Sequence, residues 1–205
     1  NFYRYGKGAS PKGVFPFLDQ CPLDGSQCKR IWQAKGNNYE NFNRLLDDDA
    51  KRFVTAYQDK NTPRNLRLRK KGKRKSKAIT NYTDHMSTMA GVQKERITYQ
   101  RKDGVQLSAT LYLPAGFKRG VDAPLPTLLW AYPSEFKSAA AAGQLRNSPF
   151  TFSRPSYSSV LFLLTQGYAI VANPTMPIIA TSLKALIPIF FCQLRQDAFS
   201  HIDSA

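Results

Sequence analysis

Residues 94–114, KERITYQRKDGVQLSATLYLP, are the stretch from which the rest of the chain can be interpreted. In the second half of this stretch apolar and polar side chains alternate, which is the period-two pattern of a half-buried β-strand. The apolar members of that half are Val105, Leu107, Ala109, Leu111 and Leu113. Ile97 and Tyr99 are apolar in the first half, and Asp103-Gly104 between the halves is a turn signal. The stretch therefore predicts a β-hairpin.

The length of the hairpin loop decides which faces of the two arms meet. A two-residue turn at Asp103-Gly104 would pair Tyr99 with Ser108 and place the apolar residues of the arms on opposite faces. A three-residue loop over 102–104, with Gly104 in the left-handed conformation, pairs Tyr99 with Leu107 and brings the apolar residues to one face. We predict this second register.

The charge of the chain is unevenly distributed. The 205 residues carry a formal net charge of +16, and residues 64–77, RNLRLRKKGKRKSK, hold nine basic side chains and no acidic one. This block predicts either a solvated loop between two domains or a contact with a polyanion such as nucleic acid. No aromatic residue interrupts the block, so it lacks the stacking surface expected of a single-strand binder.

The cysteines leave two possibilities open. Cys21 and Cys28 could form a disulfide across a turn, but no CxxC pair occurs and the count of three is odd, so we favour free thiols. Only His85 and His201 could join the cysteines as metal ligands, and neither is near them in sequence. We therefore expect no metal and no cofactor, and we expect His85 to be an exposed linker residue.

The first part of the chain predicts short strands joined by turns. Their spacing is typical of a meander, either a piece of a sandwich or a propeller blade. The predicted strands are 14–18, 28–32, 52–57 and 66–69. Residues 78–93 are rich in turn-forming and polar residues and predict a linker.

After the hairpin the pattern changes to that of an α/β structure. Residues 127–132, TLLWAY, form a nearly continuous apolar run, typical of a strand that is covered on both faces of a parallel sheet. A short helix over 156–166 and a second buried strand over 168–172, closed by Asn173-Pro174, complete a right-handed βαβ unit. The candidate helix caps are Ser156 or Ser158 at the start and Gly167 at the end.

These segments together resemble the prolyl oligopeptidase family of serine peptidases, and within it the glutamyl endopeptidase branch, including its plant chloroplast-type members. The resemblance covers roughly residues 8–180. It rests on ASPKGVFPFLD (9–19), CKRIW (28–32), LLDDDAKRFVTAY (45–57), ITNY (79–82), YQRKDGVQL (99–107), WAYPSEFKS (130–138) and ANPTMPI (172–178).

The resemblance implies a mixed fold, in which β-propeller blade strands are followed by the N-terminal part of an α/β-hydrolase domain. The implied boundaries are 1–77 for the terminal blade strands, 78–93 for the linker, 94–180 for the start of the hydrolase domain and 181–205 for a divergent tail. This tail has no family counterpart, and we expect it to be a replaced end. Its apolar stretch 183–194 contains Pro188 and is shorter than the ~20 residues of a spanning helix, so we expect no membrane partner.

The resemblance also implies hydrolysis of peptide bonds in short peptides, with cleavage after Glu as the branch specificity, in an intracellular compartment that is the plastid stroma if the plant likeness holds. Family members use a serine in a Gly-x-Ser-x-Gly elbow, an aspartate and a histidine, and this sequence contains no such elbow. His201 with Asp203 is most simply a coincidence of spacing. We therefore expect a fragment that is inactive alone. The alternatives are a basic protein acting through Arg64–Lys77 and a non-catalytic partner of an intact relative.

One implied catalytic role falls inside the chain. In the family a tyrosine at the end of the strand before the first crossover donates its hydroxyl to the oxyanion, and Tyr132 is the matching residue. Pro133-Ser134-Glu135 follows it where the family usually has glycines, and the alternative for Tyr132 is a core tyrosine. Arg146 and Arg154 are either ordinary surface residues or residues that attract an acidic side chain of a peptide substrate.

Overall fold

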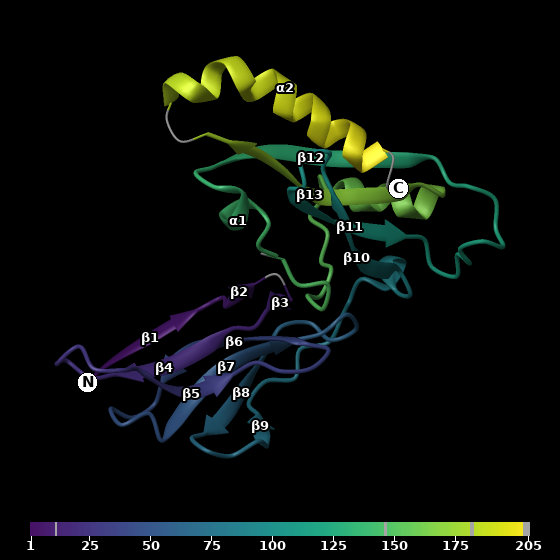
Figure 1. The fold of residues 1–205 in the computed structure, drawn as a ribbon. Coiled ribbons are helices and arrows are strands. Elements are labelled where there is room, and N and C mark those ends of the chain that lie inside the picture. The colour runs from purple at the N-terminus through teal and green to yellow at the C-terminus, as the bar shows by residue number, and fades with distance from the viewer. Residues whose placement is uncertain (11, 146, 181–182, 203–205) are drawn as a thin grey trace. The chain divides into compact units, whose positions relative to one another are not determined.

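The computed structural model describes residues 1–10, 12–145, 147–180 and 183–202 (Figure 1). These residues divide into two compact units. The first comprises residues 1–87 and 145–153, and the second comprises residues 88–144 and 154–205 as far as they are described.

The first unit consists of antiparallel sheets. A three-stranded sheet has the order β1-β4-β5, with β1 at Phe2–Gly6, β4 at Phe17–Cys21 and β5 at Lys29–Gln33. A four-stranded sheet has the order β6-β7-β8-β9, with β6 at Tyr39–Leu45, β7 at Arg52–Gln58, β8 at Asn65–Lys70 and β9 at Ser76–Ala78. Two short strands, β2 at Ala9–Ser10 and β3 at Gly13–Val14, pair with each other. Because each strand of the four-stranded sheet pairs with the next one along the chain, the predicted meander is confirmed.

The strand predictions in this unit are correct in part. β7 and β8 occupy the predicted ranges 52–57 and 66–69, extended by one residue or so at their ends. The predicted strand 14–18 is divided between β3 and β4, and Pro16, which has no amide proton to give to a sheet, lies between them. β1, β6 and β9 were not predicted, because their sequences mix polar and charged residues and lack an apolar alternation.

Aromatic side chains form the centre of this unit. Phe53 on β7 is only 1% exposed, and its ring lies 6.2 Å from that of Trp32 on β5 and 6.5 Å from that of Phe42 on β6. Phe42 in turn lies 5.1 Å from Tyr5 on β1. These contacts join strands of both larger sheets, so the aromatic side chains help to hold the sheets together.

The prediction that the cysteines are free thiols is wrong for two of them. Cys21 at the end of β4 and Cys28 just before β5 form a disulfide, with their Cα atoms 4.2 Å apart. The turn between the strands, which includes Gly25 at φ 80°, brings the two residues together. Local geometry therefore outweighs the argument from the odd count, and the third cysteine, Cys192, is free and exposed.

The basic block is not a loop that passes into a linker. It forms the β8–β9 hairpin at the edge of the four-stranded sheet, with Leu68 opposite Lys77. His85 follows in the irregular segment before β10 and is exposed, as predicted.

In the second unit the predicted hairpin is present in the predicted register. β10 at Gln93–Gln100 and β11 at Gln106–Leu113 are antiparallel, with Tyr99 opposite Leu107. The Arg101 amide donates to the Val105 carbonyl across 2.9 Å and closes the loop, in which Gly104 has φ 83°. Only a residue that tolerates the left-handed conformation fits there, which explains why the turn signal was reliable.

The two later strands are parallel neighbours, as predicted. β12 at Thr127–Phe136 pairs with β13 at Ala169–Ile179, and the sheet order is β10-β11-β13-β12. The crossover contains a one-turn α-helix, α1 at Ala139–Ala142, and a 3₁₀-helix, η2 at Val160–Gln166. Ser159 caps η2, rather than Ser156 or Ser158, and Gly167 ends it at φ 82° as predicted.

β13 does not end at Asn173-Pro174 as predicted. Asn173 adopts φ 50°, and the pairing shifts there, so that Trp130 faces Ala172 but Tyr132 faces Thr175. The strand continues past this bulge because its later half, Thr175 to Ile179, stays paired with β12. Its pairing with β11 stops at Thr110 and Ala172. Prolines are tolerated on the side of a strand that needs no amide donor.

The core of this unit lies along β11 and β13. The side chains of Leu107 and Ile170 are fully buried, and those of Leu111 and Val171 are nearly so. β12, by contrast, is an edge strand and Trp130 on it is 57% exposed. The prediction that residues 127–132 are covered on both faces is therefore wrong, although the strand itself is present.

In the segment that we expected to be a divergent tail, a long helix, α2, occupies Leu183–Ile202. Its Gln193 side chain accepts a hydrogen bond from the Ile179 amide across 2.6 Å and donates one to the Ile179 carbonyl across 3.2 Å. These two bonds join the helix to the last residue of β13, and the helix lies over the sheet (Figure 1). In the described part of the chain, no helix is both long and apolar enough to cross a membrane.

Candidate functional site

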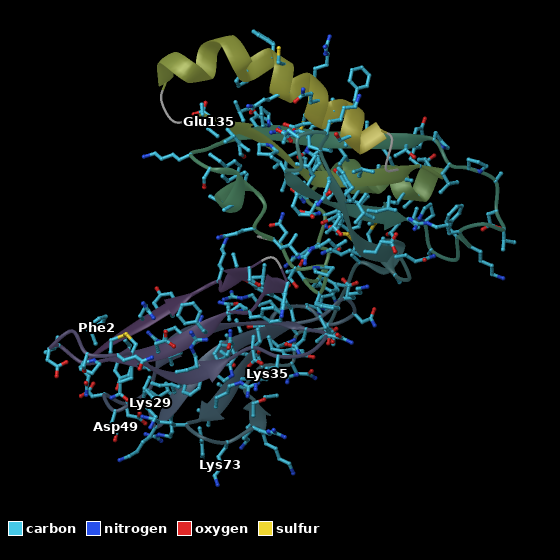
Figure 2. All side chains as sticks on the ribbon, in the orientation of Figure 1. Phe2, Lys29, Lys35, Asp49, Lys73 and Glu135 are labelled. Carbon is cyan, nitrogen blue, oxygen red and sulfur yellow. A yellow bond between two sulfur atoms is a disulfide. The ribbon has the colours of Figure 1, made fainter. Side chains whose placement is uncertain are left out.

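Tyr132 lies in β12 and is not a core residue. It is 86% exposed, and among the described residues no hydrogen bond reaches its hydroxyl. The strand continues beyond it to Phe136, so that Pro133-Ser134-Glu135 are strand residues rather than a loop. Glu135 is also exposed (Figure 2). The strand therefore presents the Tyr132 hydroxyl to solvent at the edge of the sheet, where a donor could reach a bound molecule.

The bulge between β12 and β13 sets the position of Tyr132. Tyr132 is the first residue of β12 to pair after the shift, opposite Thr175. The Thr175 hydroxyl accepts from the Ser108 amide across 2.7 Å and donates to the Ser108 carbonyl across 3.1 Å. These two bonds replace the backbone ladder between β11 and β13 and hold the strand that lies beside Tyr132.

The other residues singled out in the sequence do not join Tyr132. Arg154 is exposed, and no hydrogen bond connects it with Tyr132 within the described ranges. Arg146 and Asp203 lie outside the described residues, as does the side chain of His201. Chemically, an exposed phenol can donate a hydrogen bond, but nucleophilic catalysis also needs an activated nucleophile and its base.

A buried cluster of charges was missed by the sequence interpretation. Arg101 is completely buried and forms ion pairs with Asp103, at 2.9 Å, and with Asp197 of α2, at 2.7 Å. Burial raises the pKa of Asp197 to about 6, although the Arg101 guanidinium acts in the opposite direction. The same guanidinium holds the pKa of Asp103 below its ordinary value. No sequence signal pairs these residues, because Arg101 and Asp197 are 96 positions apart.

The first unit holds a second buried ion pair. Glu40 on β6 is 3% exposed and accepts two hydrogen bonds from Arg69 on β8, both at 2.6 Å. Thr55 donates a third to the same carboxylate. No group of three or more potential metal ligands occurs among the described residues. The Glu40–Arg69 pair thus joins two strands of one sheet, whereas the Arg101–Asp197 pair joins a hairpin loop to a helix.

Comparison with known proteins identifies clear relatives. The chain is 41% identical over 183 residues to the Arabidopsis thaliana protein named "Probable glutamyl endopeptidase, chloroplastic", a match that covers 85% of this chain and 19% of that protein. The protein of the same name from Oryza sativa subsp. japonica is also 41% identical over 183 residues, with 85% of this chain and 20% of that protein covered. No protein-family model matches the chain.

Solved structures show the same fold. A variant of the AtxE2 isopeptidase with Astexin3-dC4 bound superposes with a TM-score of 0.60 at 20% identity, over 98% of this chain and 29% of that one. A prolyl endopeptidase superposes with a TM-score of 0.52 at 16% identity, over 100% of this chain and 28% of that one. An acylaminoacyl peptidase from Pyrococcus horikoshii superposes with a TM-score of 0.53 at 16% identity, over 99% of this chain and 29% of that one.

The sequence matches and the fold agree with the likeness noted from the sequence alone. The chain spans about a fifth of the length of the curated relatives that it matches. By sequence and by fold it therefore belongs to the prolyl oligopeptidase family of serine peptidases, in which it matches the glutamyl endopeptidase branch.

Proposed function

We propose that this chain is a segment of a serine-type peptidase that hydrolyses peptide bonds in short peptides, with cleavage after Glu. The observation that carries the proposal is the 41% identity to proteins named glutamyl endopeptidases over most of the chain. Within the segment, residues 1–77 are the terminal propeller-blade strands, 78–93 the linker, 94–180 the start of the α/β-hydrolase domain and 181–205 a divergent tail. The antiparallel meander β6–β9 and the parallel pair β12–β13 support this division.

The role of Tyr132 in the complete peptidase is to donate a hydrogen bond to the oxyanion that forms during attack on the peptide carbonyl. Its hydroxyl is exposed and has no partner among the described residues, so it is available for a bond that forms only in the transition state. An oxyanion donor of this kind is worth about 3–4 kcal/mol of activation free energy. Arg154, also exposed, is available for an acidic side chain of the substrate.

The 205-residue chain does not perform this reaction alone, because its sequence contains no Gly-x-Ser-x-Gly elbow from which a serine could attack. The test is to incubate purified chain with a fluorogenic peptide that contains Glu, with and without a serine-directed phosphonate. We expect no turnover above buffer. Turnover that the phosphonate abolishes would refute the assignment of the chain as an inactive segment.

The role of Tyr132 needs a separate test in a complete relative. Replacing the tyrosine aligned with Tyr132 by phenylalanine removes one hydroxyl and is expected to lower kcat about 10²–10³-fold with little change in KM. An equal loss of activity with a raised KM and unchanged kcat would instead assign the hydroxyl to substrate binding. The plastid is the proposed compartment, since both curated relatives are named chloroplastic.

A further inference from the structure

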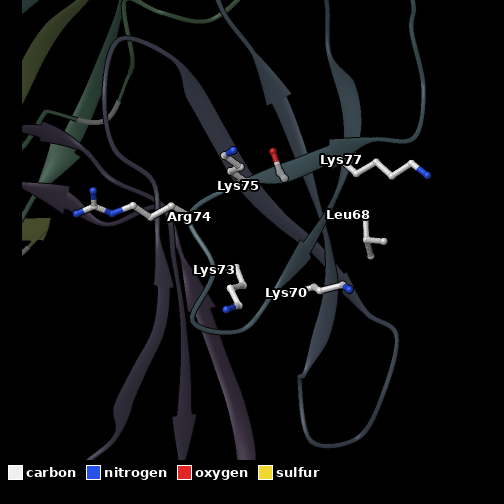
Figure 3. Close-up of a pocket in the computed structure, with 7 residues that line it drawn as sticks. Leu68, Lys70, Lys73, Arg74, Lys75 and Lys77 are labelled. Atoms are coloured by element: carbon white, nitrogen blue, oxygen red, sulfur yellow. The ribbon is translucent and has the colours of Figure 1, made fainter.

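The β8–β9 hairpin of the first unit lines an open hollow of about 630 Å³ (Figure 3). Leu68 and Ser76 contribute to its lining, and every other residue of the lining is basic. These five basic residues are Lys70, Lys73, Arg74, Lys75 and Lys77. The lining of the hollow is therefore almost wholly basic, and Arg74 and Lys77 extend to opposite sides of it (Figure 3).

The strand geometry explains why these side chains gather there. Side chains two positions apart in a strand point to the same face, and directly paired residues share a face across the ladder. Leu68 pairs with Lys77, so Lys70 and Lys75 lie on the face that these two define. Lys73 belongs to the connecting turn, where its amide donates to the Lys70 carbonyl across 3.1 Å. Its side chain extends away from the sheet (Figure 2).

The opposite face of the hairpin is anchored. Arg69 is held by the buried carboxylate of Glu40, and its Nη1 also donates to the Arg74 backbone carbonyl across 3.1 Å. The Lys71 amide donates to the Lys51 carbonyl across 2.9 Å, and Gly72 takes φ 73° at the tip. The backbone between the strands is thus fixed by bonds that leave the five basic side chains of the hollow free to rearrange.

The charge of the hollow is not compensated by the protein. Among the described residues, no ion pair joins any of its five basic side chains to a carboxylate. Cations that line one hollow repel one another, and a bound anion that contacts several of them relieves that repulsion. We propose that this hollow is a binding site for a compact anion that carries several phosphate groups.

Three properties favour such a ligand over a nucleic acid. The volume lies within the range of about 300–1,000 Å³ that is typical of small-ligand sites. No aromatic residue lines the hollow, so bases would find no stacking surface. Four of the five cations are lysines, whose ammonium groups bind phosphate as mobile point charges without imposing the fixed fork geometry of arginine. The hollow should then select among small ligands by the number of negative charges that they carry.

The test uses inorganic tripolyphosphate as the probe and isothermal titration calorimetry of the whole chain. The variant Lys73→Gln/Lys75→Gln removes two charges from the hollow. The matched control, Lys102→Gln/Lys118→Gln, removes two exposed charges from the second unit. We expect the first variant to bind tripolyphosphate at least about tenfold more weakly and the control to bind it as the unmodified chain does. The reason is that only charged groups that line the hollow can form hydrogen bonds to the bound anion. Affinity for all three should fall as salt is raised.

Comparison ligands separate the alternatives. Orthophosphate at the same ionic strength should bind much more weakly than tripolyphosphate, since it can meet fewer of the cations at once. Equal weakening by both double variants would show that only net charge matters and would overturn the site. Tighter binding of a single-stranded oligonucleotide than of tripolyphosphate, at equal phosphate concentration, would overturn the compact ligand, and an absence of tripolyphosphate binding would overturn the proposal altogether. None of these outcomes depends on peptidase activity.

Discussion

Arg101 and Asp197 form an ion pair, with Nη1 and Oδ1 2.7 Å apart, in which neither side chain is exposed to solvent. The pair joins the loop of the β10–β11 hairpin to helix α2. Arg101 also donates from the same nitrogen to the Pro177 carbonyl across 2.9 Å, so one guanidinium connects the hairpin, β13 and α2. The Oδ2 atom of Asp197 is buried without a hydrogen-bond partner among the described residues. This unsatisfied oxygen makes the ionised carboxylate costly to bury.

Asp197 is therefore expected to make stability rise on mild acidification. Burial raises its pKa to about 6, from 3.8, so between these values the folded protein binds a proton that the unfolded chain does not. The contribution of Asp197 to the free energy of unfolding should increase as pH falls from 7 to 4, by at most about 3 kcal/mol, since each tenfold change in proton affinity is worth about 1.4 kcal/mol. Urea unfolding of the unmodified chain and of Asp197→Asn at several pH values isolates this contribution. If the free energies of unfolding of the two proteins changed in parallel with pH, the predicted contribution of Asp197 would be contradicted.

The bulge in β13 gives a second prediction. Thr175→Val keeps the shape of the side chain but removes the hydroxyl that bonds both the Ser108 amide and the Ser108 carbonyl. We expect a loss of about 1–3 kcal/mol, because the backbone groups are left without partners. Thr175→Ser is the control and should retain most of the stability. Hydrogen exchange of the Ser108 amide should accelerate in the valine variant alone, and unchanged exchange would show that the bridge is unimportant.

The parts of this fold that the sequence predicts are those with a local cause. The register of the hairpin follows from the apolar alternation around Tyr99 and Leu107 together with Gly104, all within a few positions of one another. The parallel pair β12–β13 follows from two apolar runs separated by a crossover. Asn173-Pro174 misled the prediction, because this dipeptide usually ends a strand. Here Thr175 supplies, from its side chain, the bonding that the backbone does not.

The unpredicted features depend on contacts between distant positions. Arg101 and Asp197 are 96 residues apart, and Glu40 and Arg69 are 29 apart, so no local pattern identifies either pair. The candidate site shows the same limit. The family likeness identifies Tyr132 as a candidate. Its exposure depends on the position of β12 at the edge of the sheet, which a run of apolar residues does not reveal.

The disulfide gives a prediction for the first unit. Cys28→Ser should lower its stability by about 2–3 kcal/mol, the loop-closure entropy expected for a short ring. Cys192→Ser is the matched control, since Cys192 is free and exposed, and it should leave stability unchanged. Alkylation of the unreduced, unfolded protein should modify one of its three cysteines, and all three after reduction. Modification of all three before reduction would show that the bond does not form.

The buried pair of Glu40 and Arg69 links the stability of the four-stranded sheet to the basic hollow. Glu40→Gln leaves the guanidinium of Arg69 without its counter-charge and should cost about 3–5 kcal/mol, whereas Glu40→Met/Arg69→Met removes both charges and should recover most of that loss. Urea unfolding of the three proteins measures the difference.

The double variant also separates anchoring from charge. It keeps the net charge of the chain, because one acid and one base are removed together, but it deletes the bond from Arg69 to the Arg74 carbonyl. If that bond holds the connection between β8 and β9 in place, tripolyphosphate should bind more weakly to this stable, equally charged variant. Retained affinity in the double variant would mean that the side chains of the hollow find their ligand without the anchor, and that Arg69 serves the sheet alone.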